Sequence, residues 1–488
     1  MLAFLKTFTD GHEAVAGTSD PARTLEAPLT DIQWRIDMRP SRRVLPGLAL
    51  CAALIAPAHA DDAALKAEVD ALRAEVAALR ASVNEMRAGK ITVAAQPTAT
   101  APTGVATAPV AVTGVSAPAA GLAPANQVVP DTALASTTLW GYGELNYNHP
   151  TGKTGDTQAD LRRAVIGFGH SFDESTRVYG EFEWEHAVAS ADDQGETEVE
   201  QLYVEHSLSA NYGVRIGLML IPLGLLNEHH EPANYYGVER NFVETAIIPS
   251  TWREGGVAMY GSSDAGFSWS AGIGTGPDLG KWDPSSYEGR ESPLGSIHQE
   301  LQLAKAHDLS GFGALNWQGM PGLLVGGGVF AGKIGQDTAD FPADGAQLVL
   351  GEAHVRWQPG PFDLSALYSR GTISDTQALN LTYLGQPTPV PKAFWGGYAQ
   401  GAWRALEWGQ SSLVPFVRYE AFNTGAAYAQ QPAGFGTPAL PTERVWTAGA
   451  NYYLNPSVVF KLDYQRFNLD DEALGYGNRI DLGLGYQF

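Results

Sequence analysis

The chain ends in Arg479-Ile-Asp-Leu-Gly-Leu-Gly-Tyr-Gln-Phe488, a stretch in which every second residue is apolar. One face carries Ile, Leu, Leu, Tyr and Phe, and the other carries glycine, polar and charged residues. This period of two predicts a β-strand with one apolar side. A soluble sheet with so apolar an edge strand would tend to aggregate. A strand that closes a membrane barrel has lipid on one side and a pairing partner along its edge, so the stretch favours a transmembrane β-barrel.

The composition of the 488-residue chain is that of a β protein rich in glycine and aromatic residues, with 55 Gly, 19 Tyr, 18 Phe and 12 Trp. Outside the N-terminal region, no apolar run is long enough to form a transmembrane helix. The mean hydropathy of -0.14 agrees with a barrel, in which polar and apolar positions alternate. The formal net charge of -22 makes nucleic acid an unfavourable partner. Because Cys51, the single cysteine, precedes the expected mature chain, no disulfide framework is predicted.

A secretory signal peptide is predicted over residues 38–60. Basic residues directly after Met38 precede the apolar stretch Val44–Ile55, and Ala58-His59-Ala60 is a small-residue cleavage site. Residues 1–37 are therefore interpreted as a non-native extension upstream of the true start, because a signal placed so far from the N-terminus would be poorly positioned for export.

Residues 61–88 have apolar side chains spaced alternately four and three residues apart, which is the heptad pattern of a coiled coil. Flanking glutamates and arginines are placed to pair between neighbouring parallel helices, which predicts parallel self-association. Valine and leucine at the two seam positions favour two strands. A single amphipathic helix that packs on another surface is the alternative. The seam consists of Leu65, Val69, Leu72, Val76, Leu79, Val83 and Met86.

A linker and then the barrel follow. Residues 89–136 consist largely of Ala, Pro and Thr and lack the apolar surface needed to fold, so they are expected to be a linker. Residues 137–488 contain about sixteen short alternating segments bounded by Gly, Pro, Asp and Asn. The predicted fold class is therefore all-β, an antiparallel transmembrane barrel behind an N-terminal helical coiled coil. Short and long connections alternate, as expected for turns on the periplasmic side and loops outside.

The region 137–488 resembles the phosphate-selective porin O/P family, and the coiled coil resembles that of its DcaP-like members. The resemblance implies a sixteen-stranded homotrimer and an outer-membrane location, and it implies that Leu223–Ser250 folds into the pore and narrows it. The terminal Phe488 resembles the signal read by the barrel assembly machinery. The segments that carry the family resemblance are Gly217-Leu-Met-Leu-Ile-Pro-Leu-Gly224, Asn227-Glu-His-His-Glu-Pro232, Val238-Glu-Arg-Asn241 and Ile248-Pro-Ser-Thr-Trp-Arg-Glu-Gly-Gly256.

Charged residues on the inward face of the strands and in the narrowing segment should determine which solutes pass. Both signs occur, whereas a phosphate site needs several converging cations. We therefore expect a porin for passive diffusion of small polar or anionic solutes, in contact with outer-membrane lipids, with no cofactor and no enzymatic activity. The candidate pore-lining residues are Arg177, Glu181, Glu183, Arg215, Glu228, His229, His230, Glu231, Glu239, Arg240, Arg356, Arg418 and Lys461.

Three alternatives remain at this stage. Glu228-His229-His230-Glu231 offers ligand types for a divalent metal, although adjacent side chains in an extended loop point apart. The two histidines with Ser250 and Asn227 would suit an outer-membrane hydrolase only if the fold brought them together. The coiled coil could instead tether the outer membrane to the cell wall.

Overall fold

The computed structural model describes residues 136–190, 193–468 and 477–488. The predicted signal peptide, coiled coil and linker lie outside these described residues. The described chain forms one antiparallel sheet. Its strand segments are β1 Thr137–Pro150, β2 Gln158–Ser171, β3 Thr176–Glu185, β4 Thr197–Ser207, β5 Tyr212–Leu220, β6 Arg253–Ser262, β7 Phe267–Gly274, β8 Ser310–Met320, β9 Leu323–Lys333, β10 Gln347–Trp357, β11 Phe362–Ile373, β12 Ala393–Trp403, β13 Leu406–Trp408, β14 Ser411–Ala427, β15 Glu443–Asn455, β16 Val458–Phe467 and β17 Arg479–Gln487.

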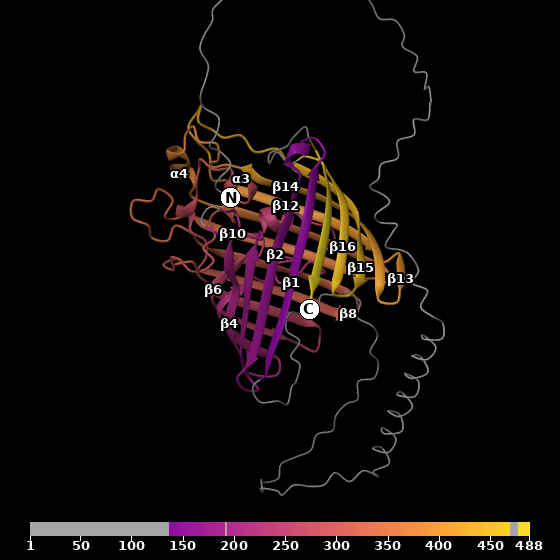
Figure 1. Cartoon of the computed structure of the whole chain (residues 1–488). Helices are drawn as coiled ribbons and strands as arrows, with labels where there is room; N and C mark the ends of the chain where they lie inside the picture. Colours follow the sequence, from indigo (N-terminus) through magenta and orange to yellow (C-terminus); the bar gives the residue numbers. More distant parts are fainter. Residues whose placement is uncertain (1–135, 191–192, 469–476) are drawn as a thin grey trace, which may run out of the picture. The chain divides into compact units, whose positions relative to one another are not determined.

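The sheet closes on itself as a barrel. Each strand pairs with the next along the chain, and β1 pairs with β17, with Tyr142 opposite Gln487. The short β13 continues β12 beyond a break at Arg404 and Ala405, since both segments pair with β14. The seventeen segments are thus sixteen strands, so the predicted closed barrel is confirmed. Figure 1 shows β1, in purple, beside the yellow strands at the C-terminus.

The connections at the two ends of the barrel differ in length, as predicted. Tight turns follow β2, β4, β6, β8, β10, β13 and β15, while longer segments follow the other strands. The longer segments contain η1 Thr154–Asp156, η2 Val243–Ile247, η3 Leu279–Lys281, α3 Glu288–Glu291 and α4 Gln377–Thr382. Among the described residues, no helix combines the length and apolar character required to cross a membrane.

The outer surface of the barrel is apolar. Ile216, Ile273 and Leu482 point outward and are 56%, 57% and 47% exposed. On β3, Trp184 is exposed on this outer face while Glu183 on the opposite face is buried. So much apolar surface is stable only in contact with lipid, and the closed sheet leaves no unpaired edge in that environment.

The inner wall is divided into an apolar part and a charged part. Inward side chains of β9 to β12 include Phe330, Leu348, Leu350 and Phe394, all 0% exposed. They pack against apolar residues of the longer connections in one hydrophobic cluster. The inner faces of β1 to β4 and β14 to β17 instead carry buried Arg, Lys, Glu and Asp. Charged groups are therefore concentrated on these strands, although β10 and β11 also carry the inward pair Arg356 and Asp363.

Candidate functional site

The segment 221–252 connects β5 to β6, and Asn227 holds its two ends together. The Asn227 Nδ2 group donates hydrogen bonds of 2.8 Å to the carbonyl oxygens of Ile221 and Trp252. Its Oδ1 accepts a 2.8 Å bond from the Trp252 backbone N–H, and the Ile221 N–H donates to the Trp252 carbonyl at 2.9 Å. The segment is thus a loop with a fixed base, which we call the constriction loop.

Glu244 organises the interior of the constriction loop. Its carboxylate accepts bonds from the backbone N–H groups of Leu225 (2.5 Å) and Leu226 (2.7 Å) and from the Asn241 side chain (2.8 Å). The Tyr398 hydroxyl on β12 donates a fourth bond of 2.9 Å. Burial raises the pKa of the Glu244 carboxyl, while its hydrogen-bond donors act in the opposite direction. Glu244 therefore joins the fold of the loop to the barrel wall.

One side of the constriction loop is apolar and matches the apolar part of the inner wall. Val243, Ile247 and Trp252 are each 0% exposed in the shared hydrophobic cluster. The Trp252 and Phe330 rings lie 4.4 Å apart between centroids. Each buried side chain of this size contributes about 1.5–3 kcal/mol to stability. This match explains why the segment folds into the barrel instead of extending away from it.

The other side of the loop reaches the far wall of the barrel. The Val238 N–H donates a 2.6 Å bond to Asp463 on β16, and the Gly237 N–H donates to Asn451 on β15 at 3.2 Å. In the closed order of sixteen strands, β15 lies opposite β6, and β16 is the strand next to β15. The constriction loop therefore spans the lumen, as the family resemblance implied for Leu223–Ser250.

His230 is a buried anchor of the loop rather than an exposed group. It is 3% exposed, and its Nε2 lies 2.7 Å from Glu200 and 2.8 Å from the Tyr142 hydroxyl. Its carbonyl accepts a 2.5 Å bond from Arg163, which also pairs with Glu144 at 2.6 Å. Sequence reasoning missed Arg163, Glu144 and Glu200. The arginine doublet at 162–163, which interrupts the alternation of β2, was the available signal for Arg163.

Most of the predicted inward cations are paired. Arg215 bonds to Glu205 at 2.9 Å and lies 3.9 Å from Glu228, and Arg177 lies 3.7 Å from Glu205. The other predicted strand residues have partners of several kinds. Arg418 bonds to Glu420 and Arg356 bonds to Asp363, both at 2.9 Å, and Glu183 lies 4.0 Å from Arg163. Glu181 accepts a 2.7 Å bond from Trp140, and Lys461 Nζ lies 3.5 Å from the centroid of the Tyr235 ring.

Glu239 and Arg240 carry the half-buried charges at the tip of the loop. Glu239 accepts bonds from the side-chain amides of Asn146 (3.3 Å) and Asn148 (3.1 Å) on β1. Arg240 donates to the hydroxyls of Ser250 and Thr251. In the described ranges no carboxylate lies within ion-pair distance of Arg240; Glu144 and Glu183 act on it at longer range. The tip thus presents one charge of each sign.

Arg162 on β2 is a further half-buried charge that sequence reasoning did not select. It interacts electrostatically with Glu239 of the loop and with Glu185 on β3. The pairing register of β1 with β2 shifts between Glu144 and Leu145 of β1, which lie opposite Arg163 and Leu161 of β2. The irregularity explains why alternation alone did not place Arg162 on the inner wall.

The four-residue segment 228–231 does not converge on one point. Glu228 faces Arg215, His230 faces Glu200, and Glu231 accepts a 2.6 Å bond from Asn234. Within the part of the chain that the structure describes, no group of three or more His, Cys, Asp or Glu side chains is arranged to hold a metal ion. Burial lowers the pKa of His229 below its usual value of 6.5.

The hydrolase arrangement is not assembled either. Ser250 contacts Arg240, Asn227 is bonded to backbone groups, and His230 is held by Glu200. A nucleophile would need a base within hydrogen-bond reach. The side chains considered for that role are instead engaged in different structural contacts.

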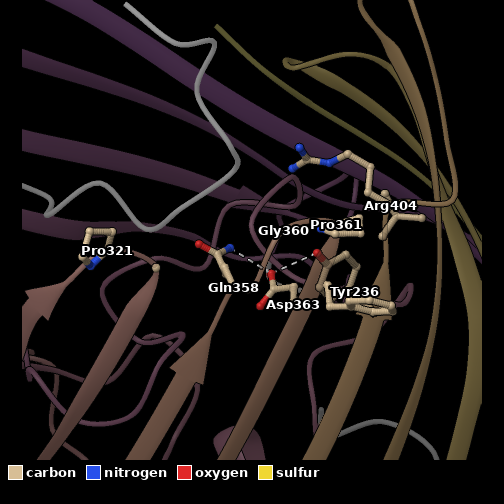
Figure 2. Close-up of a pocket in the computed structure, with 11 residues that line it drawn as sticks. Tyr236, Pro321, Gln358, Gly360, Pro361, Asp363 and Arg404 are labelled. Atoms are coloured by element: carbon tan, nitrogen blue, oxygen red, sulfur yellow. Dashed lines mark hydrogen bonds between the residues drawn. The ribbon is translucent and has the colours of Figure 1, made fainter. Parts of the chain in front are cut away.

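A cavity of about 340 Å³ lies on the short-turn side of the constriction loop. Tyr236 of the loop lines it together with the turns at Pro321–Gly322 and Gln358–Pro361, and with Arg404. Figure 2 shows Asp363 at its centre, bonded to Tyr236 and Gln358.

No family model matches the chain. A solved structure of Salmonella typhi OmpF in complex with daunomycin is similar over 72% of this chain and 97% of that chain, with a TM-score of 0.51 and 17% identity. The outer membrane channel DcaP of Acinetobacter baumannii matches 74% of this chain and 99% of its own, with a TM-score of 0.47 and 13% identity.

The OmpF comparison shows a shared porin-type barrel fold. A closed barrel with an apolar outer surface is the architecture of bacterial outer-membrane proteins, and this chain resides in that membrane. An uncharacterized protein of Aquifex aeolicus is 30% identical over 367 residues, which cover 73% of this chain and 81% of that protein. With this identity over most of both sequences, the chain belongs to the same family as the Aquifex aeolicus protein.

Proposed function

We propose that the protein is an outer-membrane porin through which small polar or anionic solutes diffuse passively. The observation that carries this proposal is the constriction loop, which spans the lumen from β5 and β6 to Asn451 and Asp463 on the opposite wall. A loop held across a closed barrel narrows the lumen and still leaves a path for small solutes. The similarity of the barrel to the OmpF structure supports the same function.

The charge arrangement favours a weak solute preference over a dedicated phosphate site. A phosphate site needs several Arg or Lys side chains that converge on one anion. Here Arg163, Arg215 and Arg418 each bond to a carboxylate. These pairs leave the wall polar but nearly neutral locally. The resemblance to the phosphate-selective porin O/P family therefore supports the channel function more than it supports phosphate selectivity.

We also propose a homotrimer. The heptad seam in residues 61–88 supports parallel association, and the resemblance to DcaP-like porins supports three chains, which overrides the weak two-stranded preference of the seam. Native mass spectrometry of the detergent-solubilised full chain should give the mass of three copies. The same measurement after deletion of residues 61–88 would show whether the helices are required, and a monomeric mass for the full chain would contradict the proposal.

Channel recordings test the proposed function directly. The purified full chain, inserted in a planar bilayer, should give discrete conductance steps, and asymmetric KCl should give a modest reversal potential. Proteoliposomes should swell in small sugars and dicarboxylates at rates that fall with solute size. Correctly folded protein that produces neither conductance nor swelling would overturn the proposal.

A further inference from the structure

The cavity below the constriction loop contains one carboxylate whose charge is already compensated. Asp363 accepts two bonds from Arg356, at 2.9 and 2.5 Å, one of 3.1 Å from Gln358 and one of 3.0 Å from the Tyr236 hydroxyl. An arginine and carboxylate joined by two bonds form a strong, geometrically fixed pair. This pair therefore forms a rigid, nearly neutral floor for the cavity.

Arg404 supplies the remaining charge at the cavity. Its backbone is fixed at the break between β12 and β13, where its N–H donates a 2.8 Å bond to the Pro361 carbonyl. Its side chain is 35% exposed and faces Glu407 at 3.3 Å, a residue that is itself 62% exposed. Such exposed pairs are weak and readily exchanged. In Figure 2 the Arg404 side chain extends over Gly360 and Pro361 and not toward Asp363.

The cavity also has an apolar wall. The Tyr236 ring stacks on Phe416 with 5.8 Å between centroids, and both pack with buried Ala402 and Val414 in a small hydrophobic cluster. An apolar wall beside one guanidinium group suits a molecule with a single carboxylate and an apolar body. A dianion would be less well matched, because Arg404 is the one cationic side chain among the described residues that line the cavity.

We propose that this cavity is a binding site for small monocarboxylates with an apolar or aromatic body. The carboxylate pairs with Arg404, and the apolar body lies against Tyr236 and Val414. The volume of about 340 Å³ is at the small end of the usual range for ligand sites. This inference rests on the proposed function, since it places the site on the path of a solute that passes the constriction loop.

The site should be reached preferentially from one side of the membrane. Its lining comes from the tight turns after β8 and β10 and from the underside of the constriction loop. A solute added at the short-turn end reaches Arg404 before it meets the loop tip. A solute added at the other end must first pass Glu239 and Arg240.

The test uses benzoate as the probe in single-channel recordings of the full-length protein in planar bilayers. Wild-type channels should show concentration-dependent current interruptions, at lower benzoate concentration from the short-turn side. Arg404→Gln should raise the half-blocking concentration about tenfold or more, the effect of losing a charge-assisted hydrogen bond. Arg404→Lys retains the charge without the planar guanidinium group, so its half-blocking concentration should lie between those of the wild type and Arg404→Gln. Neutral benzyl alcohol should not block.

Arg370→Gln is the matched control, because Arg370 is exposed on the face of β11 opposite Asp363 and carries the same charge. Arg370→Gln should leave both benzoate block and conductance in KCl unchanged. Equal benzoate block in wild type and Arg404→Gln would overturn the inference. Block of the wild type by inorganic phosphate at the same concentrations as by benzoate would also overturn it. If folded protein forms no channels, the proposed function fails; if channels form but benzoate never interrupts them, only this site fails.

Discussion

The phenol oxygen of Tyr235 donates a 2.6 Å hydrogen bond to the carboxylate of Glu144 on β1. Both side chains are buried, at 5% exposure each. The bond ties the constriction loop to the strand that closes the barrel with β17. Because Glu144 also pairs with Arg163, one carboxylate joins the loop and two strands.

Replacing Tyr235 by Phe should loosen this attachment. The variant leaves one Glu144 oxygen without its donor, and an unsatisfied buried polar group costs about 1–3 kcal/mol. We expect a lower midpoint for heat-induced loss of the folded form on gels and noisier open-channel currents. Tyr368→Phe is the control, because Tyr368 is 50% exposed on the outer face. Equal midpoints and equal noise in the two variants would contradict the anchoring role of Tyr235.

Asn227→Ala should widen the channel. The substitution removes both bonds that the Asn227 amide donates across the base of the loop, and it leaves the buried Trp252 N–H without its acceptor. A less ordered loop would obstruct the lumen less, so unitary conductance in KCl should rise. Asn234→Ala, which removes a half-buried amide bonded to Glu231, should change conductance much less. A wild-type conductance for Asn227→Ala would show that the loop does not depend on this link.

Substitution of Arg240 should change ion selectivity with less loss of stability than substitution of the paired lumen arginines. A unit charge about 8 Å from a passing ion contributes roughly 0.5 kcal/mol in water, so Arg240→Gln should favour cations about twofold in the permeability ratio. The reversal potential in asymmetric KCl measures this change. Arg215→Gln and Arg418→Gln instead remove the nearest cation from the buried carboxylates of Glu205 and Glu420, and their main effect should be lower stability. An unchanged reversal potential for Arg240→Gln would exclude it from the conducting path.

The barrel was predictable from the sequence because its determinants are local. Alternation within each strand and short turns between strands fix the outer face, so Leu482 was placed correctly. The constriction loop was placed through family resemblance, because its burial depends on an apolar part of the inner wall made by distant strands. Leu348 and Leu350 flank an outward Val349, and this continuous apolar run was the visible sign that the first part of β10 is apolar on both faces.

Site residues were less predictable because pairing across the lumen depends on register and on the path of the loop. His230 was expected to line the pore and instead lies against Glu200, a contact that joins β4 to the loop. Alternation indicates that a side chain points inward, but it does not indicate whether another segment covers it. The distinction between Arg418, 2% exposed, and half-buried Arg240 therefore required the structure.

Gly141→Ala should impair barrel closure. Gly141 and Phe488 exchange backbone hydrogen bonds of 2.9 and 3.2 Å, and a Cβ at Gly141 would lie 2.7 Å from the Phe488 ring and 2.8 Å from the Val165 carbonyl oxygen. We expect a smaller folded fraction in the outer membrane, measured on unheated gels. Gly313→Ala is the control, since the nearest atom to its Cβ would be 3.7 Å away. Equal folded fractions would contradict the role of this contact.

His229 should make selectivity depend on pH only under acidic conditions. Because burial lowers its pKa below 6.5, the imidazole is mostly neutral at and above that pH, and this group should change the reversal potential little there. As pH falls further, protonation adds a positive charge to the loop beside Glu228 and Glu231, so anion passage should increase. His229→Gln should remove this part of the pH response while preserving conductance at neutral pH. The same acidic shift in both proteins would assign it to other groups, whereas a shift centred above pH 6.5 in the wild type alone would contradict the burial of His229.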